Sequence, residues 1–397
     1  MAKITAEQAL ARIQPTRVKA TKGKAADVKP LELIDTISNA EDDLFIFGNE
    51  NGGIIAPADD SLSPILGAWE GNVDDIPPGL KDMLQEYSKE IEWWQNVGEE
   101  ISEETTADGE ERQSVPVLLE TKWSQKAPYN GKIYANCVTG CNTIAAAQIM
   151  YYWGKKGFHR GCPQTEKYVT ETNNWTIYSL PAVTVFDYKH LVKSPKTTEE
   201  KEAVQQMVNY IARLFKSDFT PNNTGAYPRQ VANYLSKDLK LGKNITYIYA
   251  SKVGNDGYDA LIYNELINGR PVLIAGWTGT GGGHTFIIDG YDADKDMYHV
   301  NWGWGGNYDG YFKISALNPH SAKAYNSNKT ATIGIQPDYK LGDVSGDGEV
   351  NIVDVTLTVN HVLKNQYNEA ADINHDGKVT ISDAQLIVDA ILGKIDL

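Results

Sequence analysis

Apolar residues in the first hundred positions recur with spacings that predict both helices and strands. Between Met83 and Trp94 they fall on one helical face, directly after Pro77-Pro78, a pair that favours a helix start. Two short apolar runs flank the turn-forming residues 49–52 and predict a hairpin. The elements expected here are a capped helix beginning at residues 5–8, hairpin strands at 44–47 and 53–56, and a long helix from residue 78.

Helical spacing dominates the first half of the segment from about Ser114 to Gln336, and short apolar runs separated by glycines dominate its second half. The expected helices cover residues 143–153, 198–215 and 228–238, and the expected strands cover 271–277, 284–289, 297–301, 311–314 and 332–335. Helices that precede strands in this way indicate an α+β domain with two sub-lobes and a cleft between them.

Residues 99–113 are acidic and rich in Ser and Thr, with few side chains to bury. Such a stretch is typical of an exposed linker, and exposed linkers are where proteases cut. The chain has 397 residues, enough for two or three domains. We therefore expect domains at residues 1–113, 114–336 and 337–397.

The composition excludes several classes of function. A hydrophobic content of 41%, with 9 Trp and 22 Tyr, is sufficient for sizeable cores. The net charge of −15 argues against nucleic acid or an anionic membrane as a partner. No apolar run is long enough to span a membrane. The first residues lack the apolar centre of a signal peptide, so we expect either a cytosolic protein or a numbering that starts after a removed signal.

Three cysteines are too few for a disulfide framework, and their surroundings distinguish them. Cys141 immediately precedes the helix formers Ala145–Gln148, which predicts that its sulfur lies at the positive end of a helix, where a thiolate is stabilised. Gly140 before it allows a close backbone approach. Cys137 lies in an expected loop and is the weaker candidate nucleophile. With Cys141 set aside, Cys137 and Cys162 either pair or stay free.

A structural alternative for the same cysteines is a zinc site. Cys137, Cys141, His159 and Cys162 have a spacing that tetrahedral zinc ligands can adopt. That hypothesis leaves His284 and the later Trp-Gly-Trp-Gly-Gly motif unexplained, so we favour a nucleophilic Cys141.

Two histidines compete for the role of catalytic base. His284 opens an apolar strand after three consecutive glycines, which suggests that backbone or substrate passes close to it. His299 lies mid-strand between Tyr298 and Val300, as a packed residue does. His284 is therefore the favoured base.

Four groups of residues between positions 115 and 336 form specific motifs. They are Trp123-x-Gln125 with Pro128-Tyr129-Asn130; Thr139-Gly140-Cys141 with Ala147–Met150; Gly282-Gly283-His284 through Gly290; and Tyr298–Gly306 through Asp309-Gly310 to Ala316–Pro319. Together they resemble the streptopain family, the bacterial relatives of papain. The order of a cysteine, then a histidine, then an asparagine is that of papain-like enzymes. The resemblance implies a two-lobed cysteine peptidase with an α+β fold.

The resemblance also implies the chemistry. The family's nucleophile falls on Cys141 and its base on His284, and together they would hydrolyse a peptide bond through an acyl-enzyme. Gln125 is implied as an oxyanion donor beside the backbone N–H of Cys141. Asn301 and Trp302 are jointly implied to orient the imidazole. A further tryptophan, Trp304, is expected to line the cleft or to pack.

Residues 1–113 resemble, less sharply, the inhibitory propeptide of the same family. The matching stretches are Phe47–Gly52, Ile65–Gly67, Ile76–Pro78 and the helix around Tyr87–Ile91. The resemblance implies an α+β propeptide that acts as the inhibitor of its own peptidase.

The last 57 residues contain a repeat with a period of 29, in which Asp343–Gly348 recurs as Asp372–Gly377 before an amphipathic helix. They hold ten acidic residues against three lysines, which suggests a cation site. Oxygen-bearing residues at alternate positions around a glycine are typical of a calcium loop. The predicted ligands are Asp343, Ser345, Asp347, the carbonyl of Glu349, Asn351 and Asp354 in the first copy, and Asp372, Asn374, Asp376, the carbonyl of Lys378, Thr380 and Asp383 in the second.

No convincing helix precedes either loop, so the repeat resembles a type I dockerin rather than an EF-hand pair. The resemblance implies a small helical module that binds Ca²⁺ and a cohesin-type protein partner. Loop positions ten and eleven, often Ser-Thr in dockerins, hold Ile352-Val353 and Ile381-Ser382. A calcium-stiffened tail without a partner therefore stays open as an alternative.

These observations favour a secreted cysteine endopeptidase, made as a zymogen, that acts on protein or peptide substrates. Calcium is abundant outside cells, and a propeptide would keep the peptidase silent during export. Calcium is expected to be structural, with no cofactor in catalysis. One alternative is a non-enzymatic, calcium-dependent binding module on a papain-like scaffold. Another is a transferase with the same Cys-His pair and an amine acceptor in place of water.

Overall fold

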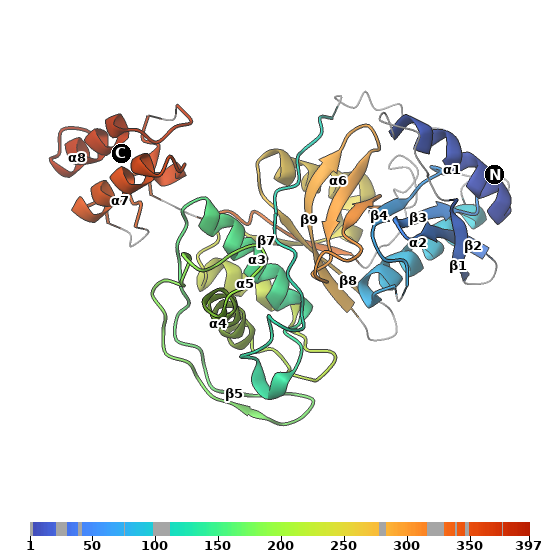
Figure 1. The fold of residues 1–397 in the computed structure, drawn as a ribbon, viewed down its shortest axis with the longest axis horizontal. Coiled ribbons are helices and arrows are strands. Elements are labelled where there is room, and N and C mark those ends of the chain that lie inside the picture. Colours follow the sequence, from blue (N-terminus) through green and yellow to red (C-terminus); the bar gives the residue numbers. More distant parts are fainter. Residues whose placement is uncertain are drawn as a thin grey trace. The chain divides into compact units, whose positions relative to one another are not determined.

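The computed structural model describes residues 3–20, 30–38, 42–74, 76–97, 112–277, 283–315, 329–337, 340–345, 349–374 and 376–397 (Figure 1). Most of the acidic linker predicted at 99–113 lies outside these residues. The chain forms two compact units. One comprises Met1–Ser124 and Thr246–Ile333, and the other comprises Gln125–Ile245 and Gly334–Leu397.

The first unit is built on an antiparallel sheet with ten strands among the described residues, in the order β1-β2-β3-β4-β11-β10-β9-β8-β12-β7. The strands are β1 (Glu32–Ser38), β2 (Asp42–Asn49), β3 (Gly52–Pro57), β4 (Gly67–Glu70), β7 (Thr246–Tyr249), β8 (Val272–Trp277), β9 (Gly283–Asp292), β10 (Met297–Asn301), β11 (Gly310–Phe312) and β12 (Thr330–Ile333). The five strands predicted between residues 271 and 335 are confirmed, with ends shifted by a few residues.

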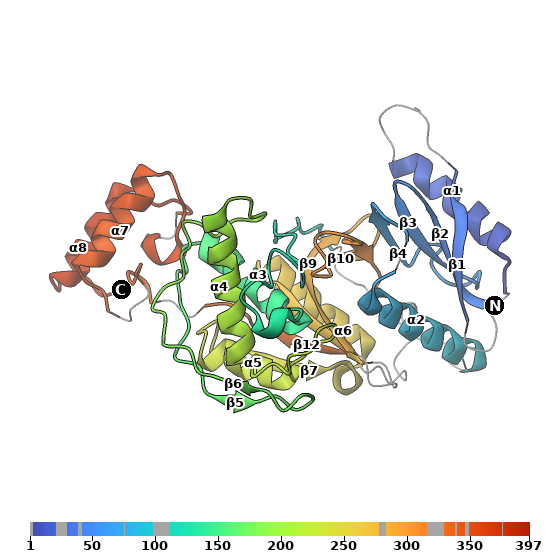
Figure 2. The same ribbon diagram turned by 60° about the horizontal axis from the view of Figure 1, so that its bottom comes forward.

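The hairpin predicted around residues 49–52 is the β2–β3 pair, and helices cover both of its faces (Figure 2). Successive side chains along a strand point to opposite faces of the sheet, so each face of the hairpin can pack against a different helix. Phe45 and Phe47 pack with α1 (Ala6–Ala20), whereas Leu44 and Ile46 share a core with α2 (Pro78–Val97). The predicted cap of α1 is confirmed, since the N–H of Gln8 donates to Thr5 Oγ1 and the N–H of Thr5 donates to Gln8 Oε1.

The strand β4 joins the N-terminal segment to the later strands. It pairs with β3 on one side and with β11 on the other, where Trp69 lies opposite Gly310. A Cβ at Gly310 would stand 2.3 Å from the carbonyl oxygen of Ala68, so only glycine permits this approach. Residues 1–113 and the second half of the 114–336 segment therefore share one sheet, which the sequence analysis did not anticipate.

Helix α6 (Ala250–Ile267) was also not anticipated, because no helix or strand was predicted between residues 239 and 270. Gly254, with φ of 73°, interrupts the helix near its start. Beyond it Tyr258, Ile262 and Leu266 are buried at intervals of four residues and pack under the sheet. Glycine, asparagine and aspartate in its first turns weaken the helical signal.

The second unit contains the three helices predicted between residues 143 and 238 (Figure 2). They are α3 (Cys141–Lys155), α4 (Thr198–Leu214) and α5 (Pro228–Lys237), with a short 3₁₀ turn η2 (Tyr134–Asn136) and the small pair β5 (Tyr168–Val169) and β6 (Thr176–Ile177). Every residue of α3 from Asn142 to Gly154 is buried, so this helix is the centre of its unit.

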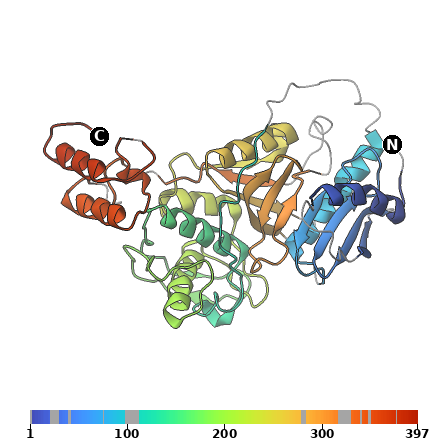
Figure 3. The same cartoon turned by 45° about the horizontal axis from the view of Figure 1, so that its top comes forward.

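The two predicted C-terminal helices are α7 (Ile352–Leu363) and α8 (Ile381–Ile391), which pack side by side (Figure 3). A 3₁₀ turn, η4 (Glu369–Ala371), lies between them in the chain. Their shared core contains Val344, Ala371, Ile373 and Ile387. Within the described residues of the whole chain, no helix has the length and apolar character needed to cross a membrane.

Candidate active site

Cys141 is the first residue of α3, and its side chain is half-buried. Gly140 before it has φ of 88°, and a Cβ there would stand 2.8 Å from the carbonyl oxygen of Thr224. A glycine is therefore required for the chain to enter the helix at this place. Asn142 donates from Nδ2 to the carbonyl oxygen of Ala226 at 2.8 Å, which ties the first turn of α3 to the chain before α5.

Gln125 lies beside the segment that leads into Cys141. The N–H of Thr139, two residues before the cysteine, donates to the backbone oxygen of Gln125 at 3.0 Å. Asn130 donates from Nδ2 to the carbonyl oxygen of Cys137 at 3.1 Å. The backbone of Gln125 and the segment that leads into α3 are thus joined within the second unit, and the side chain of Gln125 is half-buried.

The other two cysteines are buried free thiols. Burial raises the pKa of Cys137, and burial together with the charge of Asp238 raises the pKa of Cys162 to about 12. The described part of the chain holds no group of three His, Cys, Asp or Glu side chains that could bind a metal. The zinc hypothesis for Cys137, Cys141, His159 and Cys162 is therefore not supported.

His284 lies near the start of β9 and is 6% exposed. Its Nε2 is 3.1 Å from the carbonyl oxygen of Trp302 and 3.2 Å from the indole Nε1 of Trp304. With a proton, Nε2 donates to Trp302; without one, it accepts from Trp304. The ring also lies 5.6 Å from the Trp304 ring and 6.2 Å from the Trp302 ring, measured between centroids. Both protonation states of this nitrogen therefore have a partner.

Trp304 is a residue whose role the sequence analysis missed, since it was expected only to line a cleft or to pack. The signal was present in the Trp-Gly-Trp-Gly-Gly motif. Gly303, Gly305 and Gly306 have φ of 72°, 76° and 84°, and this left-handed backbone folds the loop back so that the indole reaches His284.

Asn301 holds the turn that follows β10. Its Nδ2 donates to the carbonyl oxygen of Thr121 at 2.9 Å, and its Oδ1 accepts from the N–H of Gly303 at 3.1 Å. The next residue, Trp302, is fully buried and presents its carbonyl to His284. Of the two residues predicted jointly to orient the imidazole, Trp302 contacts it directly. Asn301 holds the turn that carries Trp302.

The rival histidine, His299, belongs to a different polar group. Its Nδ1 is 2.6 Å from Oδ1 of Asp289, a carboxylate that is 0% exposed. Burial favours a lower pKa for His299, but the hydrogen bond and charge of Asp289 outweigh it and raise the pKa. His299 is a packed, ion-paired residue, in agreement with the sequence analysis.

The N-terminal segment contacts His284 through the first turn of α2. A Cβ at Gly79 would stand 2.2 Å from the ring carbon Cδ2 of His284. One turn further, burial raises the pKa of Asp82 while the charge of His284 lowers it. The face of the imidazole against α2 is therefore covered in this state.

Two residues of α2, Glu90 and Tyr87, attach the helix to the chain next to β11 and β12. Glu90, with a 0% exposed side chain, pairs with Lys329 Nζ at 2.8 Å and accepts from Ser315 Oγ at 2.8 Å. The hydroxyl of Tyr87 donates to the carbonyl oxygen of Lys313. A buried, hydrogen-bonded ion pair of this kind fixes the position of the helix.

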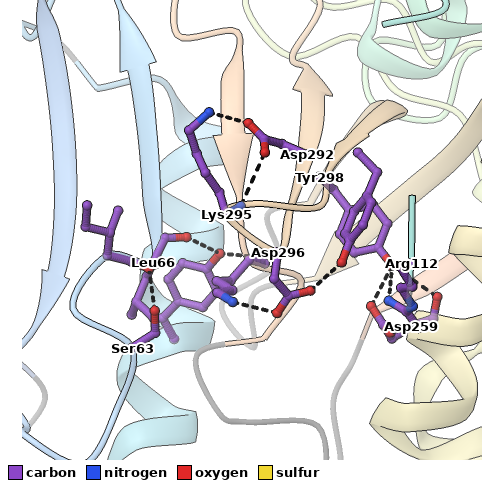
Figure 4. Close-up of polar contacts among 12 residues, drawn as sticks. Ser63, Leu66, Arg112, Asp259, Asp292, Lys295, Asp296 and Tyr298 are labelled. Carbon is purple, nitrogen blue, oxygen red and sulfur yellow. Dashed lines mark hydrogen bonds and ion pairs between the residues drawn. The ribbon is translucent and has the colours of Figure 1, made fainter. Parts of the chain in front are cut away.

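The chain re-enters the described region at Arg112, which is firmly held (Figure 4). Its guanidinium pairs with Asp259, lies 3.2 Å from the hydroxyl of Tyr298 and stacks 4.6 Å from the centroid of the Tyr263 ring. Val115 then pairs with Tyr291 in an isolated bridge. The segment that follows the linker is thus attached to the sheet from its first described residue.

Comparison with known protein families identifies the domain that contains these residues. Residues 123–312 match the sequence profile of the Peptidase C10 family, and residues 341–392 match that of the dockerin type I domain. The chain carries a cysteine peptidase domain of the C10 family. All the residues discussed as nucleophile, base and orienting groups fall within the matched region.

Individual relatives agree with this assignment. Streptopain from Streptococcus pyogenes is 26% identical over 359 residues, covering 81% of this chain and 87% of the relative. The thiol protease/hemagglutinin PrtT from Porphyromonas gingivalis is 26% identical over 400 residues, which is 93% of this chain but 44% of that relative. A cysteine-to-alanine mutant of a prointerpain A fragment from Prevotella intermedia has the same fold, with a TM-score of 0.64 at 23% identity over 78% of this chain and 99% of that one.

The C-terminal loops have the chemistry of cation sites, and type I dockerin domains in general bind calcium. Asp354 and Asp383, at loop position twelve, are 0% exposed, and Asp343 and Asp372, at position one, are 5% and 2% exposed. Asp383 accepts from the N–H groups of Ile373 and Thr380, and Asp354 accepts from those of Ser345 and Asn351. Each carboxylate joins the start of its loop to the end, which fits a loop that closes around an ion.

The remaining predicted ligands have mixed outcomes. Asp347 lies outside the described residues. Asn351 and Thr380 cap α7 and α8 by accepting from the N–H groups of Val353 and Ser382, a role the sequence analysis did not name. In the second loop Asp372 accepts from the N–H of Gly377, and Asp376 accepts from that of Lys378. Carboxylate, amide and hydroxyl oxygens are ligands that calcium takes, but the described part of the loops shows no assembled group of three acidic side chains that could hold a metal.

Proposed function

We propose that the chain is the zymogen of a secreted cysteine endopeptidase in which Cys141 and His284 act as a thiolate–imidazolium pair. The observation that carries the proposal is the surroundings of His284. Its Nε2 contacts the Trp302 carbonyl and the Trp304 indole, which hold the ring in one orientation. A general base is held in this way when its other ring nitrogen exchanges a proton with the thiol. The position of Cys141 at the first residue of α3 supports its role as the nucleophile.

The proposed reaction has two stages. The Cys141 sulfur attacks the carbonyl carbon of a peptide bond, and the resulting oxyanion accepts from the backbone N–H of Cys141 and the side chain of Gln125. His284 donates its proton to the departing amine as the C–N bond breaks, leaving a thioester. Water then loses a proton to His284 and attacks the thioester, which releases the acid and returns the proton to the pair.

Residues 1–113 serve in this proposal as the inhibitory propeptide. Three contacts support it: β4 extends the sheet beside β11, Gly79 lies against the ring of His284, and Glu90 pairs with Lys329. A relative of the same fold bears a name that denotes a pro-form. Activation would cut the linker that precedes the anchored residue Arg112 or the bonds next to it.

Residues 337–397 serve as a calcium-stabilised dockerin module that binds a cohesin-type partner. At loop positions ten and eleven, Ile352 is 67%, Val353 is 50% and Ile381 is 61% exposed. Exposed apolar side chains at equivalent places in both repeats suit a partner with an apolar surface rather than one that reads Ser-Thr. Extracellular calcium would keep the loops filled, which supports secretion.

One experiment tests the enzymatic part. The purified chain is incubated under reducing conditions, and its mass and its labelling by a thiol-alkylating peptidase inhibitor are followed. We expect the wild type to lose the segment before residue 114 and to take up one label. Neither change is expected in Cys141→Ala, and His284→Ala should not process itself. A wild-type chain that stays at full length and takes up no label would contradict the proposal.

A further inference from the structure

The loop that carries Trp302 and Trp304 is closed at its base by a carboxylate. It leaves the sheet at the end of β10 and returns at the start of β11. Asp309, the last residue before β11, accepts from the N–H of Trp302 through Oδ1 at 2.9 Å. Tyr308 next to it has φ of 65°, so left-handed residues occur at both ends of the loop. The side-chain bond thus joins the first residue of the loop to its last.

Asp309 is part of a group of charged residues behind the loop. His299 and Asp289 are joined by a 2.6 Å contact, and Asp289 also accepts from the N–H of Leu119 through Oδ2 at 3.0 Å. His299, Asp289 and Lys122 are the charged groups that act on Asp309. These three come from β10, β9 and the segment before Gln125. The charges of His299 and Lys122 favour the Asp309 carboxylate, whereas that of Asp289 disfavours it.

Three of these residues, Lys122, His299 and Asp309, line a cavity of about 550 Å³. Its wall also includes Asn301, the residue that holds the turn through Thr121 and Gly303. The rings of Trp302 and Tyr308 pack against Phe312 and Trp69. The hydrogen bonds of Asn301 and Asp309 add to this packing by tying the two ends of the loop.

We propose that Asp309 is a positioning residue for the catalytic base. By holding the N–H of Trp302, it sets the place of the Trp302 carbonyl and the Trp304 indole, the two groups that contact Nε2 of His284. This inference rests on the function proposed for His284. In this proposal Asp309 does not contact the reacting atoms and acts on His284 through the loop. A displaced loop would leave His284 without one of its partners while the substrate-binding surfaces stay as they are.

The test uses the self-processed enzyme and a peptide substrate at one pH. Asp309→Ala removes the acceptor and is expected to lower kcat by about tenfold, the effect of one lost hydrogen bond, with KM within about twofold of the wild type. Asp309→Asn keeps an oxygen acceptor at the same place and should recover most of the lost kcat. Asp294→Ala, an exposed aspartate in the β9–β10 turn, is the matched control and should leave both constants unchanged.

Melting temperatures of all variants show whether each folds. If the alanine chain does not fold, Asp309→Ser provides a second truncation and the same drop in kcat is expected. A kcat of Asp309→Ala within twofold of the wild type would overturn the proposal, as would a loss that asparagine does not recover. Activity that persists in His284→Ala would instead overturn the proposed function. Inactive His284→Ala together with fully active Asp309→Ala would overturn this inference alone.

Discussion

Gly79 lies against the imidazole of His284 so closely that a Cβ on it would stand 2.2 Å from ring carbon Cδ2 and 2.6 Å from Cγ. Two segments about two hundred positions apart in the chain meet here without a side chain between them. The first turn of α2 can cover the ring only because residue 79 has no side chain. The contact therefore links the identity of one residue in the N-terminal segment to the accessibility of the proposed base.

Gly79→Val should weaken the latency of the full-length chain. The new side chain cannot occupy the space of the ring, so α2 or His284 must move. We expect self-processing to begin several-fold faster than in the wild type, which a time course of chain mass would measure.

Gly257→Ala is the control for this substitution. Gly257 lies in α6 of the same unit, and a Cβ there would meet its nearest neighbour, Val253, at an ordinary 3.4 Å. Its processing rate should match the wild type. Equal rates for the valine variant and the wild type would show that α2 does not restrain the enzyme through His284.

Glu90→Ala should loosen the attachment of α2. The substitution leaves the 12% exposed side chain of Lys329 without its buried carboxylate partner. Removing one partner of a buried pair costs about 3–5 kcal/mol, so a clear drop in the free energy of unfolding is expected. Denaturant unfolding of the Cys141→Ala chain measures it without interference from self-cleavage. Glu92→Ala, an exposed neighbour on α2, should change it by less than about 0.5 kcal/mol.

The local patterns of the sequence predict the helices and hairpins well but not the sheet that unites them. The Thr5–Gln8 cap, the β2–β3 hairpin and α3 follow from residues near one another in the chain. The pairing of β4 with β11 joins residues that are more than 240 positions apart. No periodicity within either strand specifies such a partner, because pairing depends on which edge is free once the rest has folded.

The candidate site was predictable to the extent that its motifs are local. Cys141, with its glycine and its helix, could be read directly from the residues around it. The role of Trp304 depends on three glycines in left-handed conformation that turn the indole back, and the role of Asp309 depends on how that loop closes. Both roles depend on the conformation of the loop. The sequence therefore identifies the motif but does not show which of its residues contacts His284.

Thiol labelling should distinguish the three cysteines. Cys137 and Cys162 are buried, and burial raises the pKa of each, that of Cys162 to about 12. A thiol whose pKa lies above the working pH stays protonated and unreactive, and its thiolate appears only as the pH approaches that pKa. At pH 7.5 the processed enzyme should therefore take up one equivalent of iodoacetamide, located by peptide mapping at Cys141.

Unfolding provides the control for that experiment. In urea all three thiols should react, because the burial that raises the two pKa values is lost. Cys162→Ala should leave the native stoichiometry at one, whereas Cys141→Ala should reduce it to zero. Two or more equivalents in the native enzyme would mean that Cys137 or Cys162 is more accessible than the structure indicates.

Calcium removal should destabilise the C-terminal module selectively. The buried carboxylates of Asp354 and Asp383 each join the start of a loop to its end, and calcium would neutralise their charge. The full-length chain is first freed of metal ions with a chelator. Titration with calcium should then reveal two binding sites. Calcium at a hundred times its dissociation constant should stabilise the module by about 2.7 kcal/mol per site, seen as a higher melting temperature of the C-terminal transition alone.

Asparagine at either position tests the assignment of these ligands. Asp354→Asn and Asp383→Asn lose the charge and keep only one of the two oxygens that accept from backbone N–H groups. Each should therefore remove one site and lower the calcium-dependent gain in melting temperature by about half, because the two loops are equivalent. Asp396→Ala, an exposed aspartate outside both loops, should bind two ions as the wild type does. Two sites of unchanged affinity in Asp383→Asn would show that position twelve does not bind the ion, and the repeat would then be stabilised by its helix caps and apolar core alone.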